Sequence, residues 1–299
     1  MEQTYDPRNA DLLVNVDGVL SRPDEARISP FDSVVQGGDA VWEGLRLYGG
    51  RIFRLTEHLA RLRRSAHALA FETIPDDEAI IEQIRRTLAA NDMRDDVHIR
   101  LTLTRGVKVT SGMDPRLNQA GPTLIVLAEF KSPVYDDSGI TLVTSSVRRH
   151  RADSLDPKIH HNNLLTSILA KVEANVAGAG DALMLDDAGF VAETNATHVF
   201  FVTDGVVHTS TTKACPEGIT REAILGICST TGIPAGVGDH SLVQHYTADE
   251  VFVTGTMGGL TPVVAIDGRR IGGGKRGPVT ERLVTAYAEL TAREGVAVV

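Results

Sequence analysis

The sequence predicts a chain of two α+β domains, each an antiparallel or mixed sheet, or a small barrel, with helices packed against it. Three observations support this fold class. Short segments of alternating apolar and polar residues are joined by glycine-containing pairs that are typical of tight hairpins. Stretches with apolar residues at helical spacing lie between them, in both halves of the chain. The length of 299 residues is enough for two domains, each with its own core.

The first half is expected to begin with two hairpins. Apolar segments flank Asp17-Gly18 and Gly49-Gly50, and both pairs readily adopt the backbone angles of a tight turn. Thr56 can cap the helix that follows, and a second helix is expected over 76–90. Both helices have apolar residues at helical spacing, so they would cover one face of the sheet.

The segment 97–104 alternates strictly, so it is expected to form a strand with two different faces. One face is apolar and consists of Val97, Ile99, Leu101 and Leu103. The other face carries His98, Arg100, Thr102 and Thr104, and it is polar enough to line a site. A loop to Pro122 and a strand over 123–130 would complete the first domain.

The predicted boundaries are 1–130 for a smaller N-terminal domain, 131–138 for a linker and 139–299 for a larger C-terminal domain. The second domain is expected to contain a strand over 145–149, hairpins at Asp204-Gly205 and Asp267-Gly268, and helices that open near Thr220 and Pro278. An amphipathic helix before residue 175 would carry a set of aliphatic residues: Leu164, Leu165, Ile168, Leu169 and Val172.

Composition and charge argue against several partner classes. The net charge of −9, with basic residues interspersed among acidic ones, gives no electrostatic footprint for nucleic acid or an anionic membrane. Cys215 and Cys228 have neither the spacing of a zinc site nor the density of a disulfide scaffold, so no metal is expected and a reducing cytoplasm fits. The sequence lacks a signal-like N-terminus and a membrane-length apolar run, which predicts a soluble, unsecreted protein.

Four stretches carry the residues best suited to chemistry, at 53–62, 156–165, 218–221 and 254–263. In this order, the set resembles the class IV pyridoxal-phosphate enzymes, which include branched-chain aminotransferases, D-amino-acid aminotransferases, (R)-amine transaminases and aminodeoxychorismate lyases. The resemblance covers nearly the whole chain. Each stretch alone has a simpler reading, because a loop lysine or a strand-end acid is usually a solvated charge.

The resemblance implies a fold-type IV enzyme with pyridoxal 5'-phosphate as its cofactor. Lys158 lies where the family has the lysine that forms an imine with the cofactor, and Glu193 matches the glutamate that faces the pyridine nitrogen. Asn163 replaces a tyrosine that bonds the phenolate oxygen in branched-chain enzymes, and asparagine can still donate. The implied phosphate site combines Arg61 with backbone donors at two glycine-led turns, which attract an anion as helix starts do: Ile219, Thr220, Gly255 and Thr256.

Two arginines are candidates for binding the substrate carboxylate. Arg100 corresponds to the arginine of the branched-chain pattern Tyr-Ile-Arg, with His98 at the tyrosine position. Arg105 resembles the carboxylate-binding arginine of D-amino-acid aminotransferases, and each arginine has a strand-surface salt bridge as its simpler reading. Trp42 matches a pocket-wall aromatic of the family or packs in the core. Met257 begins a Met-Gly-Gly that replaces the usual Ala-Ala-Glu and resembles the (R)-amine transaminases.

The resemblance implies an aminotransferase that exchanges an amino group between an amino acid and a 2-oxo acid by a ping-pong mechanism, as at least a homodimer. We favour a hydrophobic or branched-chain L-amino acid with 2-oxoglutarate over a D-amino acid, then an (R)-amine, then a lyase reaction. A phosphate- or nucleotide-binding protein without covalent chemistry is the alternative from another class. Against it, the sequence contains no Gly-x-x-x-x-Gly-Lys-Ser/Thr loop and no Gly-x-Gly-x-x-Gly motif in a strand-helix unit.

Overall fold

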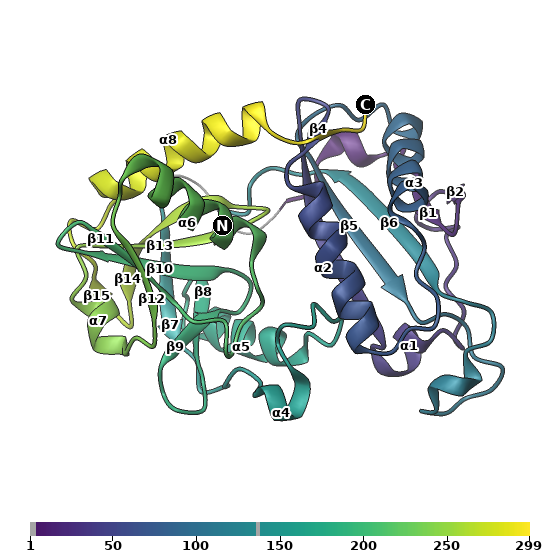
Figure 1. Cartoon of the computed structure of the whole chain (residues 1–299), viewed down its shortest axis with the longest axis horizontal. Helices are drawn as coiled ribbons and strands as arrows, with labels where there is room; N and C mark the ends of the chain where they lie inside the picture. Colours follow the sequence, from purple (N-terminus) through teal and green to yellow (C-terminus); the bar gives the residue numbers. More distant parts are fainter. Residues whose placement is uncertain (1–3, 136–137) are drawn as a thin grey trace. The chain divides into compact units, whose positions relative to one another are not determined.

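The computed structural model of the protein describes residues 4–135 and 138–299 (Figure 1). The chain divides into two compact units, each with its own sheet. The N-terminal unit comprises the described residues up to Ser132, together with Ile159–Asn163 and Thr291–Val299. The C-terminal unit comprises the described residues of Pro133–Lys158, together with Leu164–Leu290.

The N-terminal unit contains, within the described ranges, a seven-stranded antiparallel sheet in the order β16-β4-β3-β5-β6-β1-β2. Its strands are β1 (Val14–Val16), β2 (Val19–Ser21), β3 (Ala40–Tyr48), β4 (Arg51–Ile52), β5 (Val97–Thr104), β6 (Thr123–Phe130) and β16 (Val296–Ala297). The predicted hairpins at Asp17-Gly18 and Gly49-Gly50 are confirmed, and all four residues have the positive φ angles that these turns require.

Helices cover the apolar face of this sheet, as predicted (Figure 1). The helical elements are η1 (Pro7–Asn9), α1 (Ser33–Gly37), α2 (Leu55–Ala68), α3 (Asp77–Ala90) and η2 (Pro115–Leu117). The apolar face of β5 is fully buried against α2 and α3, so the predicted alternation of this strand is confirmed. Thr56 does not cap α2, because that helix begins at Leu55 after a left-handed Arg54 without a side-chain cap. Asp76 caps α3 by accepting a hydrogen bond from the Ala79 N–H.

Two segments of the expected C-terminal domain belong to the N-terminal unit because their hydrogen bonds lie there. The Asn162 N–H donates to the carbonyl of Ala40 in β3 over 2.8 Å. Strand β16 pairs with β4, with Val296 opposite Ile52. Two residues of the expected linker over 131–138, at positions 136 and 137, lie outside the described residues.

The C-terminal unit contains, in the part of it that the structure describes, a nine-stranded mixed sheet in the order β12-β11-β10-β13-β14-β7-β8-β9, with β15 paired to β14. Its strands are β7 (Ile140–Thr144), β8 (Asp181–Leu185), β9 (Val191–Thr194), β10 (His198–Thr203), β11 (Val206–Ser210), β12 (Ala235–Gly238), β13 (Glu250–Gly255), β14 (Gly259–Ile266) and β15 (Arg269–Arg270). The predicted strand over 145–149 is wrong. Strand β7 ends at Thr144, and the hydroxyl of the next residue donates to Glu173 over 2.6 Å.

The helices of the C-terminal unit are α4 (Ala152–Leu155), α5 (Leu165–Val176), α6 (Ile219–Thr231), α7 (Leu242–Tyr246) and α8 (Pro278–Arg293). The predicted starts of α6 and α8 are confirmed to within one residue. Helix α5 packs on the sheet through two alanines, Ala170 and Ala174. Its larger apolar residues face outward instead, with exposures of 67% for Leu165, 54% for Ile168 and 55% for Leu169. Helices long and apolar enough to cross a bilayer do not occur in the described ranges.

Candidate functional site

Glu193 is a buried carboxylate near the end of β9, where all four strand residues are buried. Only 5% of Glu193 is exposed, and a charge so placed needs a partner. Arg149 supplies one, with Nη2 lying 2.7 Å from Oε1 of Glu193. The other nitrogens of Arg149 are held by Ser167 Oγ at 3.1 Å and by the Ala214 carbonyl at 3.3 Å. The sequence singled out Glu193 but not the arginine that orients it.

His198 connects Glu193 to two further segments of the same unit. Its Nδ1 lies 3.7 Å from Oε2 of Glu193, and its backbone pairs with Thr254 of β13 across the sheet. The imidazole also packs on Gly218, where an added Cβ would lie 2.2 Å from Nε2. Only glycine fits beside His198 at this position, so Glu193, the start of α6 and the end of β13 gather around one imidazole.

The start of α6 has the features of an anion-binding site. Gly218 is its N-cap and provides no side-chain cap, so the first-turn N–H groups have no side-chain acceptor. Thr220 and Arg221 in this turn are buried, and Nε of Arg221 lacks a hydrogen-bond partner among the described residues. Nearby in β13, the buried hydroxyl of Thr254 also lacks a partner within the described ranges. The predicted Gly255 and Thr256 follow directly and are half-buried.

Lys158 lies in the turn after α4, in the same unit as Glu193. Its backbone N–H donates to Oδ1 of Asp156 over 2.9 Å, which fixes the turn. Its side chain is exposed, and its ammonium forms no hydrogen bond or ion pair within the described part of the chain. The amine is therefore uncommitted, and the structure shows no bond between it and the described Glu193 or His198.

Arg61 lies in the N-terminal unit, in a buried charged cluster with Glu43 and two histidines. Its Nε and Nη2 donate to the two oxygens of Glu43 over 2.9 and 2.7 Å, and His58 Nδ1 lies 2.7 Å from the same carboxylate. Burial alone would raise the pKa of Glu43, but the charge of Arg61 and the hydrogen bonds from Arg61 and His58 hold that pKa well below its usual range. The sequence pointed to Arg61 as a phosphate ligand and missed Glu43 as its partner.

Arg100 projects from the polar face of β5 toward Trp42. Its Cζ lies 3.5 Å from the centre of the Trp42 ring, and its Nη2 donates to Oδ1 of Asn162 over 2.7 Å. Burial lowers the pKa of Arg100 to about 10, against the opposing influence of the Glu43 charge. Across the described ranges, no carboxylate pairs with this guanidinium. Trp42 is fixed in turn by a stack on His160, with ring centroids 4.3 Å apart.

Arg105, the competing carboxylate candidate, is occupied by the fold. Its Nε and Nη2 donate to the two oxygens of Asp39 over 2.6 and 3.1 Å. Its guanidinium also reaches the carbonyls of Leu69 and Ala70 over 2.6 and 3.1 Å, and it lies over the ring of Phe71. The geometry therefore favours Arg100 as the carboxylate ligand and gives Arg105 a structural role.

The remaining predicted residues have less definite surroundings. His98 neighbours Arg100 on the polar face of β5, and burial lowers its pKa despite the carboxylate of Glu129 at 3.8 Å. Asn163 is exposed and Met257 is half-buried, and neither side chain forms a hydrogen bond within the described residues. The predicted substrate-binding residues thus include one well-defined group, formed by Arg100 and Trp42.

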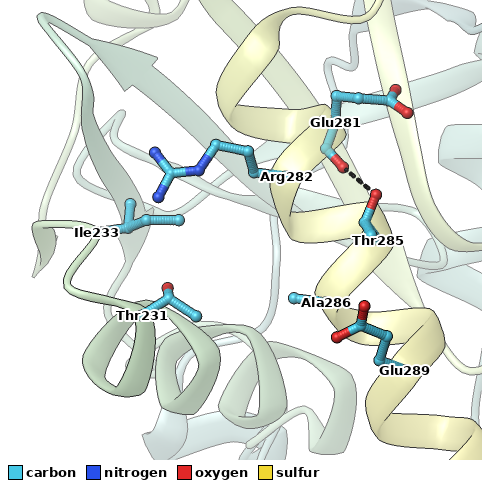
Figure 2. A pocket seen from close by; sticks show the side chains of 7 residues that line it. All are labelled: Thr231, Ile233, Glu281, Arg282, Thr285, Ala286 and Glu289. Atoms are coloured by element: carbon cyan, nitrogen blue, oxygen red, sulfur yellow. Dashed lines mark hydrogen bonds between the residues drawn. The ribbon is translucent and has the colours of Figure 1, made fainter.

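A separate hollow of about 300 Å³ lies between the end of α6 and α8 (Figure 2). Its lining consists of Thr231, Ile233, Glu281, Arg282, Thr285, Ala286 and Glu289. The side chains of the two α8 acids, Glu281 and Glu289, are exposed to solvent. This hollow lies at the opposite end of α6 from Gly218, and no residue predicted for the functional site lines it.

Replacing Arg105 with glutamine is expected to destabilise the N-terminal unit by about 2–4 kcal/mol, because Asp39 and two carbonyls lose their partner. Denaturant unfolding followed by the fluorescence of Trp42, the only tryptophan in the chain, measures this loss. The Michaelis constant for a 2-oxo acid should stay within about twofold of its value in the unmodified protein, since the donors of Arg105 are committed to the fold. A large rise in that constant without destabilisation would assign Arg105 to the substrate instead.

The stability of the N-terminal unit is expected to fall as the pH drops below about 6.5, the ordinary pKa of histidine. Burial lowers the pKa of His160 to about 3, and Arg61 acts in the same direction. The unfolded chain therefore takes up a proton that the folded chain does not, which costs up to about 1.4 kcal/mol per pH unit between pH 6.5 and 3. His160→Gln should flatten this part of the curve in Trp42 fluorescence. An unchanged curve would show that His160 is protonated in the folded protein.

Comparison with known proteins gives consistent similarities. Residues 40–266 match the family model of amino-transferase class IV. The chain is 55% identical over 291 residues to branched-chain-amino-acid aminotransferase-like protein 2 of Arabidopsis thaliana, covering 97% of this chain and 52% of that protein. It thus spans about half the length of this relative. It is also 37% identical over 288 residues to the putative branched-chain-amino-acid aminotransferase of Methanocaldococcus jannaschii, covering 96% of this chain and 99% of that protein.

Solved structures are similar over nearly the same length. A branched-chain amino acid aminotransferase from T.th., complexed with N-(5'-phosphopyridoxyl)-L-glutamate, has a TM-score of 0.87 and 36% sequence identity. The match covers 95% of both chains. The predicted fold class is confirmed by this similarity.

Proposed function

Since the chain belongs to the class IV aminotransferases, we propose that it is a pyridoxal-phosphate-dependent enzyme that exchanges an amino group between an amino acid and a 2-oxo acid. The observation that carries the proposal is the group of residues around His198. There, a buried carboxylate, an uncapped helix start and the end of β13 come together in one unit. The uncommitted amine of Lys158 in the same unit supports the same chemistry.

The residues present fit this cofactor. Pyridoxal phosphate supplies an aldehyde that reacts with amines and a ring that withdraws electrons from the substrate carbon. Lys158 would hold the aldehyde carbon, Glu193 the ring nitrogen and Asn163 the phenolate oxygen. The phosphate would be held by backbone N–H groups at the start of α6 and after β13, together with the guanidinium of Arg61: Ile219, Thr220, Gly255, Thr256 and Arg61.

The chain's own residues then divide the work. The amine of Lys158, once free, moves a proton at the α carbon of the substrate. Arg149 holds the carboxylate of Glu193 in one orientation and compensates its burial, so that the acid stays available to a cationic ring nitrogen. Arg100 binds a substrate carboxylate, with Trp42 as the wall beside it. His98 and Met257 would line the same substrate pocket.

For the substrate, we propose a hydrophobic or branched-chain L-amino acid with 2-oxoglutarate as acceptor. The names of the relatives support this choice over a D-amino acid, an (R)-amine or a lyase reaction. The direct test offers L-leucine, D-alanine and (R)-phenylethylamine separately, with 2-oxoglutarate or pyruvate as acceptor. The proposal expects L-leucine alone to change the absorption of the bound cofactor and to give a new amino acid.

Other outcomes of this test have defined meanings. Reaction with D-alanine or the amine alone would correct the chirality of the substrate, and failure of all three donors would favour the lyase. A purified protein that stays colourless and takes up no pyridoxal phosphate would overturn the proposal in favour of a phosphate- or nucleotide-binding protein.

Removing Arg61 is expected to weaken cofactor binding by about tenfold or more, because a charge-assisted contact to phosphate is lost. The Glu43→Gln background keeps the buried cluster free of an uncompensated acid. The measurement therefore compares the dissociation constant of pyridoxal phosphate for Glu43→Gln with that for the Glu43→Gln, Arg61→Gln pair. Equal constants would contradict the phosphate assignment.

We further propose a homodimer in the cytoplasm. The exposed aliphatic residues of α5 form one apolar face that a second copy would cover. Cys215 and Cys228 are both free and buried, as expected in a reducing compartment. A fully active monomer in sizing experiments would count against the dimer.

A further inference from the structure

Arg100 is an arginine whose charge the described chain does not neutralise. Charged side chains removed from water are usually paired with an opposite charge. Arg100 instead has an aromatic ring beside it, at 3.5 Å from its Cζ, and one neutral amide oxygen at 2.7 Å. Burial lowers its pKa to about 10, which leaves it cationic at neutral pH. Such a guanidinium attracts an anion strongly.

The neutral oxygen belongs to Asn162, and the fold fixes its position. The Asn162 N–H donates to the Ala40 carbonyl over 2.8 Å, so its backbone extends the edge of β3. The two residues before it are fixed to Trp42, through the indole Nε1 bonded to the His161 carbonyl over 3.0 Å and through the stack on His160. Asn162 is therefore a rigid acceptor.

We propose that Asn162 is a positioning residue that determines specificity for anionic substrates. Its amide oxygen orients the guanidinium of Arg100 without cancelling the charge, so that the remaining N–H donors and the net charge serve a substrate carboxylate. An aspartate of the same shape would form an ion pair with Arg100 and compete with that carboxylate. The inference rests on the proposed function, which makes carboxylates the substrates of the enzyme.

The same segment has a second consequence for the site. Asn162 lies a few residues after Lys158, so the loop that carries the proposed reactive amine also carries the residue that orients the carboxylate ligand. Substrate recognition by Arg100 and the path of the backbone after Lys158 thus depend on one set of hydrogen bonds to β3.

The test measures binding of glutarate, a dicarboxylate that cannot react, to the protein loaded with pyridoxal phosphate. Asn162→Asp should weaken glutarate binding by about tenfold or more and raise the Michaelis constant for 2-oxoglutarate by a similar factor, with a much smaller change in kcat. Asn162→Ala should have a smaller effect, since Arg100 keeps its charge. Gln119→Glu, which adds the same charge at an exposed loop position of the same unit, serves as the control and should bind glutarate normally.

A double-mutant cycle decides between positioning and a purely structural role. In an Arg100→Gln background, Asn162→Asp should weaken glutarate binding no further, because the competing ion pair cannot form. The inference is overturned if Asn162→Asp binds glutarate normally, or if its effect is equally large without Arg100. Since glutarate binding needs no turnover, this result is independent of the donor assay. Failure of all three donors would remove the proposed function and leave the carboxylate result standing.

Discussion

Replacing Lys158 with alanine is expected to reduce amino-group transfer by at least about a thousandfold, because one side chain both forms the covalent link and moves the proton. Pyridoxal phosphate should still bind, since the start of α6, the end of β13 and Glu193 remain. Cofactor retention on gel filtration and steady-state rates with the preferred donor measure the two effects. Because the Lys158 side chain is exposed and makes no bond in the described chain, the variant should fold normally.

Lys275→Ala is the matched control for this variant. Lys275 is also exposed and unbonded within the described residues, but it lies outside all the predicted motifs. Its removal should leave both the rate and the cofactor binding unchanged. A Lys158→Ala protein with a rate near that of the unmodified protein would show that another residue carries the chemistry.

Replacing Glu193 with glutamine is expected to slow amino-group transfer by about a hundredfold, a typical cost of losing one fixed electrostatic contact to developing charge. The substitution conserves shape, but it removes the charge that favours a cationic ring nitrogen and leaves Arg149 without its ion-pair partner. Cofactor affinity should change by less than about tenfold, because the phosphate contacts lie elsewhere. Rapid mixing of loaded protein with donor, together with cofactor titration, separates the rate from the affinity.

Glu289→Gln provides the control for a lost carboxylate in the same unit. Glu289 lies on α8 in the hollow at the far end of α6 from the site (Figure 2). It should behave as the unmodified protein does. If Glu193→Gln lost affinity in proportion to rate, Glu193 would be a binding residue instead of an electronic one.

Local sequence patterns predicted much of the fold. The Asp-Gly pairs at residues 17, 204 and 267 all form turns with positive φ, because few other pairs adopt that conformation without strain. The alternation in β5 correctly separated a buried face from a polar one. Such signals succeed because they depend only on neighbouring residues.

The sequence could not provide partners that lie far apart along the chain. The pairing of Arg149 with Glu193, and of Glu43 with Arg61, depends on which strands and helices meet. Charge type and spacing were visible in advance, but the choice of partner was not. For the same reason, the sequence left both Arg100 and Arg105 as candidates, whereas the structure commits Arg105 to Asp39.

The apolar face of α5 failed for a related reason. A helical repeat of Leu165, Ile168 and Leu169 predicts that this face is covered, but it cannot say by which element. Within a single chain the face is exposed, and the small residues Ala170 and Ala174 pack on the sheet instead.

The most direct measurement is borohydride reduction of the protein loaded with pyridoxal phosphate, followed by proteolysis and mass mapping of the modified peptide. The account predicts a single phosphopyridoxyl group on the peptide that contains Lys158. Reduction that attaches the cofactor to a different lysine, or to none, would contradict it.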